Sequence, residues 1–399
     1  MSFILYYLLR KFFVELTITP DAIILRRGLV FRRFHTVPLR SVVRVTVRRS
    51  ILLRIFRAKE AEIFTLNGKF KLFLRRDEDV PAFAKPPAHY IKPRFRETAF
   101  GAFIDVRALG GIALFAAVLR RIGTIFGGKY LDNILDALDT AAVNVEHIFS
   151  AMQVYVPRTA YVLAVFALAA WAFAYLRKLA ALSRFRVGRR GGYVVVTSGL
   201  FTLYEHTLVP NSAATVICDS PVSILAKHAP VYLRGVMICP SLNKKSALKL
   251  VHILSGERLG KKPKITPPRK AAFGYCAAPL GWGAAFAVLL SFVYISDSLR
   301  GAMLLKTALY CGLFVSLYAA AVCLLYIRHS GITFGERLYK VGARRSLRLY
   351  TAIFRKDVIV GEELSQSVFQ RRSGLCNVKI SIAERRSFKT RLLPRDKLR

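Results

Sequence analysis

The chain has 399 residues, of which 54% are hydrophobic, yet it carries a formal net charge of +40. This hydrophobicity excludes a disordered basic tail, because disordered segments are poor in apolar residues. The six cysteines are scattered and no CxxC occurs, which excludes a secreted disulfide scaffold. We therefore expect the apolar and the charged residues to occupy different parts of the chain.

The charge falls into three basic blocks that alternate with two nearly neutral, apolar blocks. Residues 1–100 carry a net charge of +13, residues 177–273 carry +14 and residues 328–399 carry +12. The two stretches between them carry 0 and +1. The basic blocks are therefore candidates for folded domains, and the neutral blocks are candidates for membrane segments.

The first basic block predicts a β domain over residues 1–98. Its first 14 residues hold too few apolar positions before Arg10-Lys11 to cross a membrane, so we expect an interfacial segment there. Short β-type runs follow, and Asn67-Gly68 predicts a hairpin turn. The expected strands are FVELTI, AIILRRG, LVFRRF, SVVRVTV, EIFTL and KFKLFL.

The neutral blocks predict four transmembrane helices in two hairpins, over residues 99–178 and 271–328. Uncharged or almost uncharged runs of roughly 20 residues are long enough to span a bilayer. The weakest span holds Asp105 and Arg107, which we place near its end because a charge at a helix centre is costly. The expected spans are about 102–122, 159–176, 273–296 and 307–327.

The distribution of charge predicts the topology of these helices. Cytoplasmic loops carry an excess of Lys and Arg, and two hairpins would place all three basic blocks on one side. The loop 123–158 has a net charge of −2 and would lie outside, with an amphipathic helix pattern over 128–152. We therefore predict a multi-pass protein of the inner (plasma) membrane with a cytoplasmic N-terminus and C-terminus.

The second and third basic blocks predict further β domains, over residues 179–270 and 329–399. In the second block we expect YVVVTSG, LFTLYEHTLV, AATVICD and VYLRGVMIC as strands, followed by a helix over 245–254. In the third we expect RLYKVG, LRLYTAIF, DVIVGEEL and NVKISIA as strands.

The basic blocks also resemble one another, which indicates an array of related domains. Gly28-Leu29 is followed by HTVP (35–38), and Gly199-Leu200 is followed by HTLVP (206–210). His35 and His206 thus occupy equivalent positions, for which we expect a structural role. The third block carries LRLYTAIFRKDVIV at the corresponding place and then SQSVFQRRSGLCNVKI (365–380).

The order strand, Gly-Leu, strand, Pro, strand, QSxxQRRxGL, strand resembles the bacterial pleckstrin-homology-like, membrane-flanked domain family, in particular its YdbS/YdbT-type multi-domain members. The second block lacks the Gln-Arg-Arg run and its glycine, and the third lacks the final helix of the family. The resemblance implies cytoplasmic, barrel-like seven-stranded domains with one capping helix, attached to membrane hairpins. It also implies a link to envelope stress or antimicrobial-peptide resistance.

Clusters of arginine are the candidate contact sites. Arginines near an anionic membrane surface contribute about 1 kcal/mol each to binding, although positive-inside topology alone also requires basic residues beside spans. We predict contacts with lipid or a partner at Arg44, Arg48, Arg49, Arg54, Arg57, Arg371 and Arg372.

The fold class predicted is thus membrane α + β, with four transmembrane helices in two hairpins that alternate with three PH-like β-barrel or sandwich domains. No catalytic or metal-binding motif is present, so we predict no enzyme, no cofactor and no metal site. We expect a scaffold that binds anionic inner-leaflet lipids and membrane proteins, a homologous PH-like protein among them, but no nucleic acid. The alternative is an accessory or permease-like subunit of a transport system.

Overall fold

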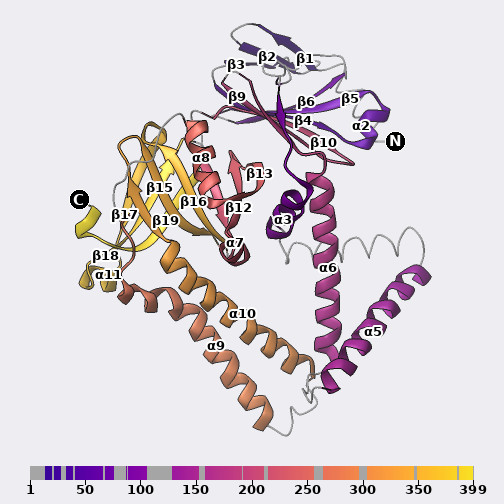
Figure 1. Cartoon of the computed structure of the whole chain (residues 1–399), viewed down its shortest axis with the longest axis vertical. Helices are drawn as coiled ribbons and strands as arrows, with labels where there is room; N and C mark the ends of the chain where they lie inside the picture. The colour runs from indigo at the N-terminus through magenta and orange to yellow at the C-terminus, as the bar shows by residue number, and fades with distance from the viewer. Residues whose placement is uncertain are drawn as a thin grey trace.

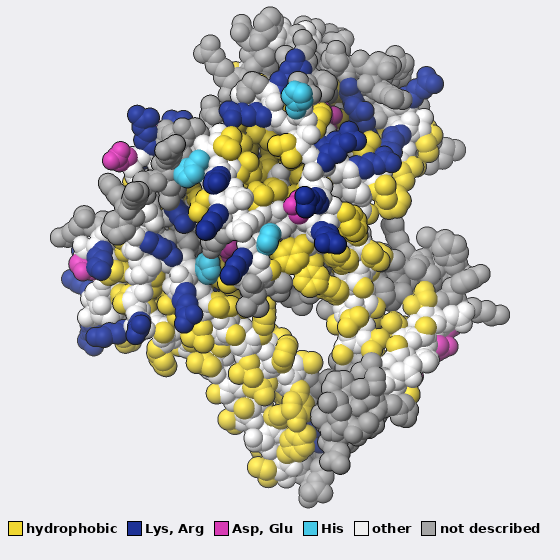
Figure 2. Space-filling view, in the orientation of Figure 1, with side chains coloured by type: hydrophobic (Ala, Val, Ile, Leu, Met, Phe, Trp, Pro, Cys, Tyr) yellow, Lys and Arg dark blue, Asp and Glu magenta, His cyan; other side chains and the backbone are white. Residues whose placement is uncertain are grey.

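A computed structural model of the chain shows β units gathered at one end of long apolar helices (Figure 1). The Lys and Arg side chains lie over the β units, whereas the helices are coated with apolar side chains (Figure 2). The structure describes residues 14–19, 22–27, 33–38, 41–65, 68–75, 87, 89–105, 128–151, 158–190, 192–210, 214–255, 264–295, 303–345, 348–383 and 386–398.

The N-terminal unit consists of two antiparallel sheets of three consecutive strands. Its core contains Ile23, Val45, Ile63 and Leu72, which alternate with more exposed positions along their strands. A short helix, α2 (Ile51–Ile55), links the first two strands of the second sheet. The strands are β1 (Val14–Ile18), β2 (Ala22–Arg27), β3 (Arg33–Pro38), β4 (Val42–Arg49), β5 (Ala58–Thr65) and β6 (Lys69–Arg75).

The middle unit repeats this order. Its core joins both sets of strands to helix α8 through Val196, Val231 and Val251. Helix α3 also contributes Ala102 to this core. The elements are β7 (Tyr90–Ile91), α3 (Phe95–Asp105), β8 (Arg186–Arg190), β9 (Tyr193–Ser198), β10 (Leu203–Leu208), β11 (Thr215–Asp219), α7 (Pro221–Ala226), β12 (His228–Leu233), β13 (Val236–Asn243) and α8 (Lys244–Ser255).

The C-terminal unit has the same order again, with a core built around Phe354, Ile380 and Phe388. Its elements are β14 (Gly331–Phe334), β15 (Leu338–Arg345), β16 (Arg348–Arg355), η5 (Lys356–Val358), β17 (Ile359–Ser365), α11 (Val368–Arg372), β18 (Leu375–Ile382), β19 (Arg386–Pro394) and η6 (Asp396–Leu398).

Three of the described helices contain stretches long and apolar enough to cross a membrane: Ala164–Leu182, Arg269–Ile295 and Ala308–His329. They indicate a membrane protein and confirm a membrane α + β class. The first predicted span, about 102–122, lies outside the described residues except for the end of α3. The helices that contain or flank these stretches are α5 (Gly128–Ala151), α6 (Arg158–Leu182), η3 (Arg269–Ala271), α9 (Ala272–Ile295) and α10 (Met303–His329).

The β units are not separate in the structure, because two sheets pass from one unit into the next. One sheet has the order β6-β5-β4-β10-β9-β8-β7, and another has the order β13-β12-β11-β16-β15-β14. The middle unit therefore contributes four strands, β7 to β10, to the first shared sheet and three strands, β11 to β13, to the second. This pairing was not predicted from the sequence.

Several predicted strands need correction. Of the expected strand LVFRRF (29–34), residues 29–32 lie outside the described residues, and the described strand β3 continues beyond it, from Arg33 to Pro38. The run VYLRGVMIC is a hairpin rather than one strand, because Arg234 and Gly235 adopt positive φ angles of 50° and 78° and turn the chain. Strands β8, β14 and β19 were not predicted, while α5 and α8 confirm the helical patterns over 128–152 and 245–254.

Candidate functional site at the junctions between β units

A serine marks the same position in all three units. Ser50, Ser220 and Ser367 each have extended backbone angles and begin α2, α7 and α11, respectively. Each hydroxyl oxygen accepts a hydrogen bond from a backbone N–H three residues later, at 3.3, 3.1 and 3.3 Å. Serine favours this N-cap position because its side chain satisfies a free helical N–H. The serine therefore provides a common reference for β4, β11 and β17, the strands that precede it.

The strand before this serine forms the contact between units in two of the three cases. We call the pairing of β4 with β10 the first junction and the pairing of β11 with β16 the second junction. The residue two before the serine faces a tyrosine in both, as Arg48 faces Tyr204 and Cys218 faces Tyr350. The two junctions thus share strand direction and register.

Polar contacts reinforce the first junction. Thr46, on β4, shares a hydrogen bond of 3.0 Å between its Oγ1 atom and Nδ1 of His206, on β10. The Arg44 guanidinium lies 3.6 Å from the ring centre of Phe64 and donates a 3.0 Å hydrogen bond to the carbonyl of Arg234. Arg54 donates at 3.2 Å to the carbonyl of Phe201. These bonds tie the N-terminal unit to three segments of the middle unit.

Burial is the main cause that lowers the pKa of His206, to about 4, and the positive charge of Arg44 lowers it further. Glu62 acts in the opposite direction. His206 is therefore neutral at neutral pH. Its ring stacks on Tyr204 of the same strand, with ring centres 5.9 Å apart.

The second junction contains a buried carboxylate, on β11. Asp219 is 3% exposed and accepts a 3.3 Å hydrogen bond from the Thr351 hydroxyl across the junction. Nδ1 of His329, at the end of α10, lies 3.9 Å from the same carboxylate. The second junction is thereby connected to the end of an apolar helix.

Residues 1–93 match the family model of the bacterial PH domain. The match covers the N-terminal unit, and it confirms the predicted relation to a bacterial PH-like domain family. No curated protein and no solved structure matches the chain.

The predicted arginine sites fall in two separate places. Those of the N-terminal unit, which we call the PH domain from here on, lie on β4, on α2 and in the turn after α2. Two of them, Arg44 and Arg54, make the junction contacts described above. Arg48 pairs with Glu60 at 3.7 Å, and Arg57 has a positive φ of 49° in an exposed turn. Arg49 is the last residue of β4, opposite Leu203.

Arg371 and Arg372 lie on α11 of the C-terminal unit, and both are exposed. Val368 and Phe369 on the same helix are 71% and 82% exposed. Leu375, just after α11, packs in a cluster with Ala271, the last residue of η3, and Tyr275 in the first turn of α9. Helix α11 therefore presents apolar and cationic side chains beside the first turn of an apolar helix (Figure 1).

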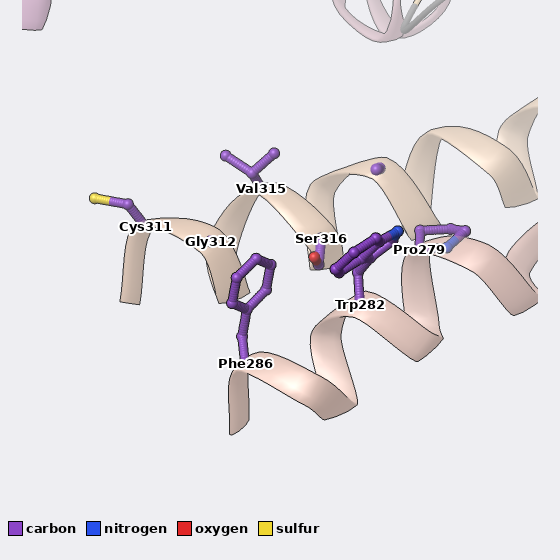
Figure 3. A pocket seen from close by; sticks show the side chains of 8 residues that line it. Pro279, Trp282, Phe286, Cys311, Gly312, Val315 and Ser316 are labelled. Carbon is purple, nitrogen blue, oxygen red and sulfur yellow. The ribbon is translucent and has the colours of Figure 1, made fainter. Parts of the chain in front are cut away.

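A groove of about 650 Å³ lies between α9 and α10 (Figure 3). Its lining is almost entirely apolar and includes Pro279, Trp282, Phe286 and Val315, with Ser316 as the polar member. Within the described part of the chain, no three His, Cys, Asp or Glu side chains are grouped to hold a metal ion. Such a groove suits a hydrocarbon chain or an apolar side chain.

Some residues of the junctions could not be found from sequence patterns. Asp219 and Arg234 are isolated charges in apolar surroundings, and nothing in their spacing points to a contact in another unit. The repeated His-Thr of HTVP and HTLVP was the available signal for His206. It indicated a structural position, but it did not name Thr46 as the partner.

Proposed function

We propose that the chain is a non-enzymatic scaffold of the inner membrane, with three PH-like domains displayed on the cytoplasmic side of four spans. The observation that carries this proposal is the pair of shared sheets, which joins the three units into one body at one end of the apolar helices. A body of this kind holds its surfaces in fixed relative positions, as a scaffold requires. Its partners would be other membrane proteins and anionic lipids, in envelope stress or antimicrobial-peptide resistance.

We assign the lipid contact to α11. Arg371 and Arg372 would meet anionic head groups, while Val368 and Phe369 would enter the interface beside α9. Each cation near an anionic surface contributes about 1 kcal/mol, and exposed apolar side chains add burial energy. Arg44 and Arg54 already contact carbonyls of the middle unit, which favours α11 over the PH domain for this role.

The apolar groove between α9 and α10 supports a scaffold more than a transport subunit. A transporter would need polar groups or ionisable residues along a path through the membrane. The groove instead offers aromatic and aliphatic side chains. It is the kind of surface on which lipid chains or another apolar helix would pack.

The test compares the full chain in nanodiscs of anionic lipid and of phosphatidylcholine alone, by hydrogen exchange of residues 366–375. We expect slower exchange of α11 in the anionic discs, and loss of this difference in Arg371→Gln/Arg372→Gln. The control variant Lys245→Gln/Lys249→Gln removes the same charge from exposed positions on α8 and should behave like the original chain. Equal exchange of α11 in both kinds of disc would refute the lipid contact.

Partner binding is tested separately, by purification of the full chain in a mild detergent after cross-linking in membranes. We expect a membrane protein to remain attached through the β units, with cross-links to residues of the shared sheets. Recovery of no membrane protein under these conditions would contradict the scaffold role.

A further inference from the structure

Strands β4, β11 and β17 each precede an N-cap serine. Two of them, β4 and β11, form junctions, whereas β17 lies at the edge of its sheet. Counted from the N-cap serine, β17 corresponds to β4 and β11, and the pairing with the next strand confirms this. In both strands the residue four before the serine faces the residue twelve after the same serine on the next strand. These pairs are Thr46 with Glu62, and Glu363 with Lys379. Yet in the described part of the chain β17 pairs only with β18.

The free side of β17 is long and apolar in part. Val360 and Leu364 are 73% and 63% exposed, and every position from 360 to 364 is exposed. The corresponding positions of β4 and β11 are largely buried, because a strand of the next unit covers them. Edge strands of this kind are sites for pairing with another chain.

The matching edge lies at the other end of the chain. The junctions use β10 and β16, the third strand of their units, and the third strand of the PH domain is β3. In the described residues β3 pairs only with β2. Among the described strands, each copy therefore has one unpaired edge of each kind, and both lie on the side of the apolar helices that bears the β units (Figure 1).

We propose that β17 of one copy pairs with β3 of a second copy, so that copies associate head to tail. The register follows from the first junction, where the residue four before the serine faces the histidine of the His-Thr motif. The same register places Glu363, which also pairs with Lys379 on β18 at 2.8 Å, opposite His35 and diagonal to Arg33. Opposite charges across neighbouring strands stabilise a pair, and acidic residues are scarce in this chain.

This arrangement deepens the proposed scaffold role by naming one partner, and it has a structural consequence. The two surfaces that meet are different, so the interface is heterologous. Repetition gives a closed ring if the rotation closes and an open row of molecules if it does not. Because every copy is anchored in the membrane, growth would be confined to its plane.

The test uses two full-length copies with different tags in the same membrane, one carrying Glu363→Cys and the other His35→Cys. We expect a disulfide between the two copies, because opposite positions on antiparallel strands lie within disulfide range. Phe34→Cys is the matched control, because successive residues of a strand project to opposite faces of a sheet. Each cysteine variant alone gives the background from the native cysteines.

A charge exchange provides the second measurement. Glu363→Lys in both copies should abolish co-purification of the two tags, and Arg33→Glu added to one of the two copies should restore it. Glu336→Lys makes the same charge change at an exposed site away from β17 and should have no effect. Equal cross-linking of residues 34 and 35, no cross-link at all, or capture of only a different protein at β17 would overturn the proposal. Lipid-dependent exchange of α11, measured on the same samples, reports separately on the proposed function.

Discussion

Acidification should loosen the first junction through protonation of His206. The pKa of this histidine is about 4 in the folded protein, against an ordinary value of 6.5. Because the folded state resists protonation, the stabilisation is complete above pH 6.5 and is lost progressively as pH falls toward the folded value. At about pH 5 the loss is about 2 kcal/mol, or roughly thirtyfold in the equilibrium for opening.

Hydrogen exchange of β4 and β10 in the full chain, in nanodiscs, measures this opening. After correction for the intrinsic effect of pH, we expect exchange to be roughly thirtyfold faster at about pH 5 than at about pH 7.5. His206→Gln cannot titrate but can still form a hydrogen bond with Thr46, so its exchange should lose most of this dependence. Strand β18, in the C-terminal unit, is the internal reference.

The reasoning would be refuted if the His206→Gln variant kept the full pH dependence. In that case Glu62, the carboxylate that raises the pKa of His206, would be the first group to examine. It would also be refuted if β4 and β10 opened no faster at the lower pH in the original chain.

Three further substitutions test the packing. Gly101→Ala would bring a Cβ atom against the carbonyl oxygen of Pro240, so hydrogen exchange should show α3 and β13 destabilised by about 1–3 kcal/mol. Ser367→Ala removes the N-cap of α11 and its reciprocal bond with Gln370. It should lower the free energy of opening of α11 by about 1 kcal/mol and so speed its hydrogen exchange. Phe354→Ala empties a site that is 1% exposed, and denaturant titration followed by exchange in β16 should show a loss of about 3–5 kcal/mol. Unchanged exchange in any of these would contradict the corresponding contact.

The sequence predicted features that depend on local pattern. Short β-type runs such as YVVVTSG (193–199) predicted strands, and the uncharged run 273–296 predicted a helix that the structure places at Ala272–Ile295. The last residues of α10, up to His329, and strand β14 (Gly331–Phe334) were not predicted. Strand β14 has only four residues, which is too short for a period to be seen.

Pairing between units could not be read from the sequence. A strand carries the same alternation whether its neighbour belongs to its own unit or to the next one, so β4 gives no sign of β10. The partners Thr46 and His206 are 160 residues apart. Arg44 and Arg54 were among the predicted contact residues, but they were interpreted as sites for lipid or a partner and not as contacts between units.

The first junction also determines an order of events during synthesis. Strand β4 emerges from the ribosome long before β10, because about 160 residues, including the apolar helix α6, are made between them. At bacterial or eukaryotic rates this interval lasts roughly 10–30 s. The PH domain must therefore wait with one side of β4 open, and that nascent edge is where chaperones or premature association would act.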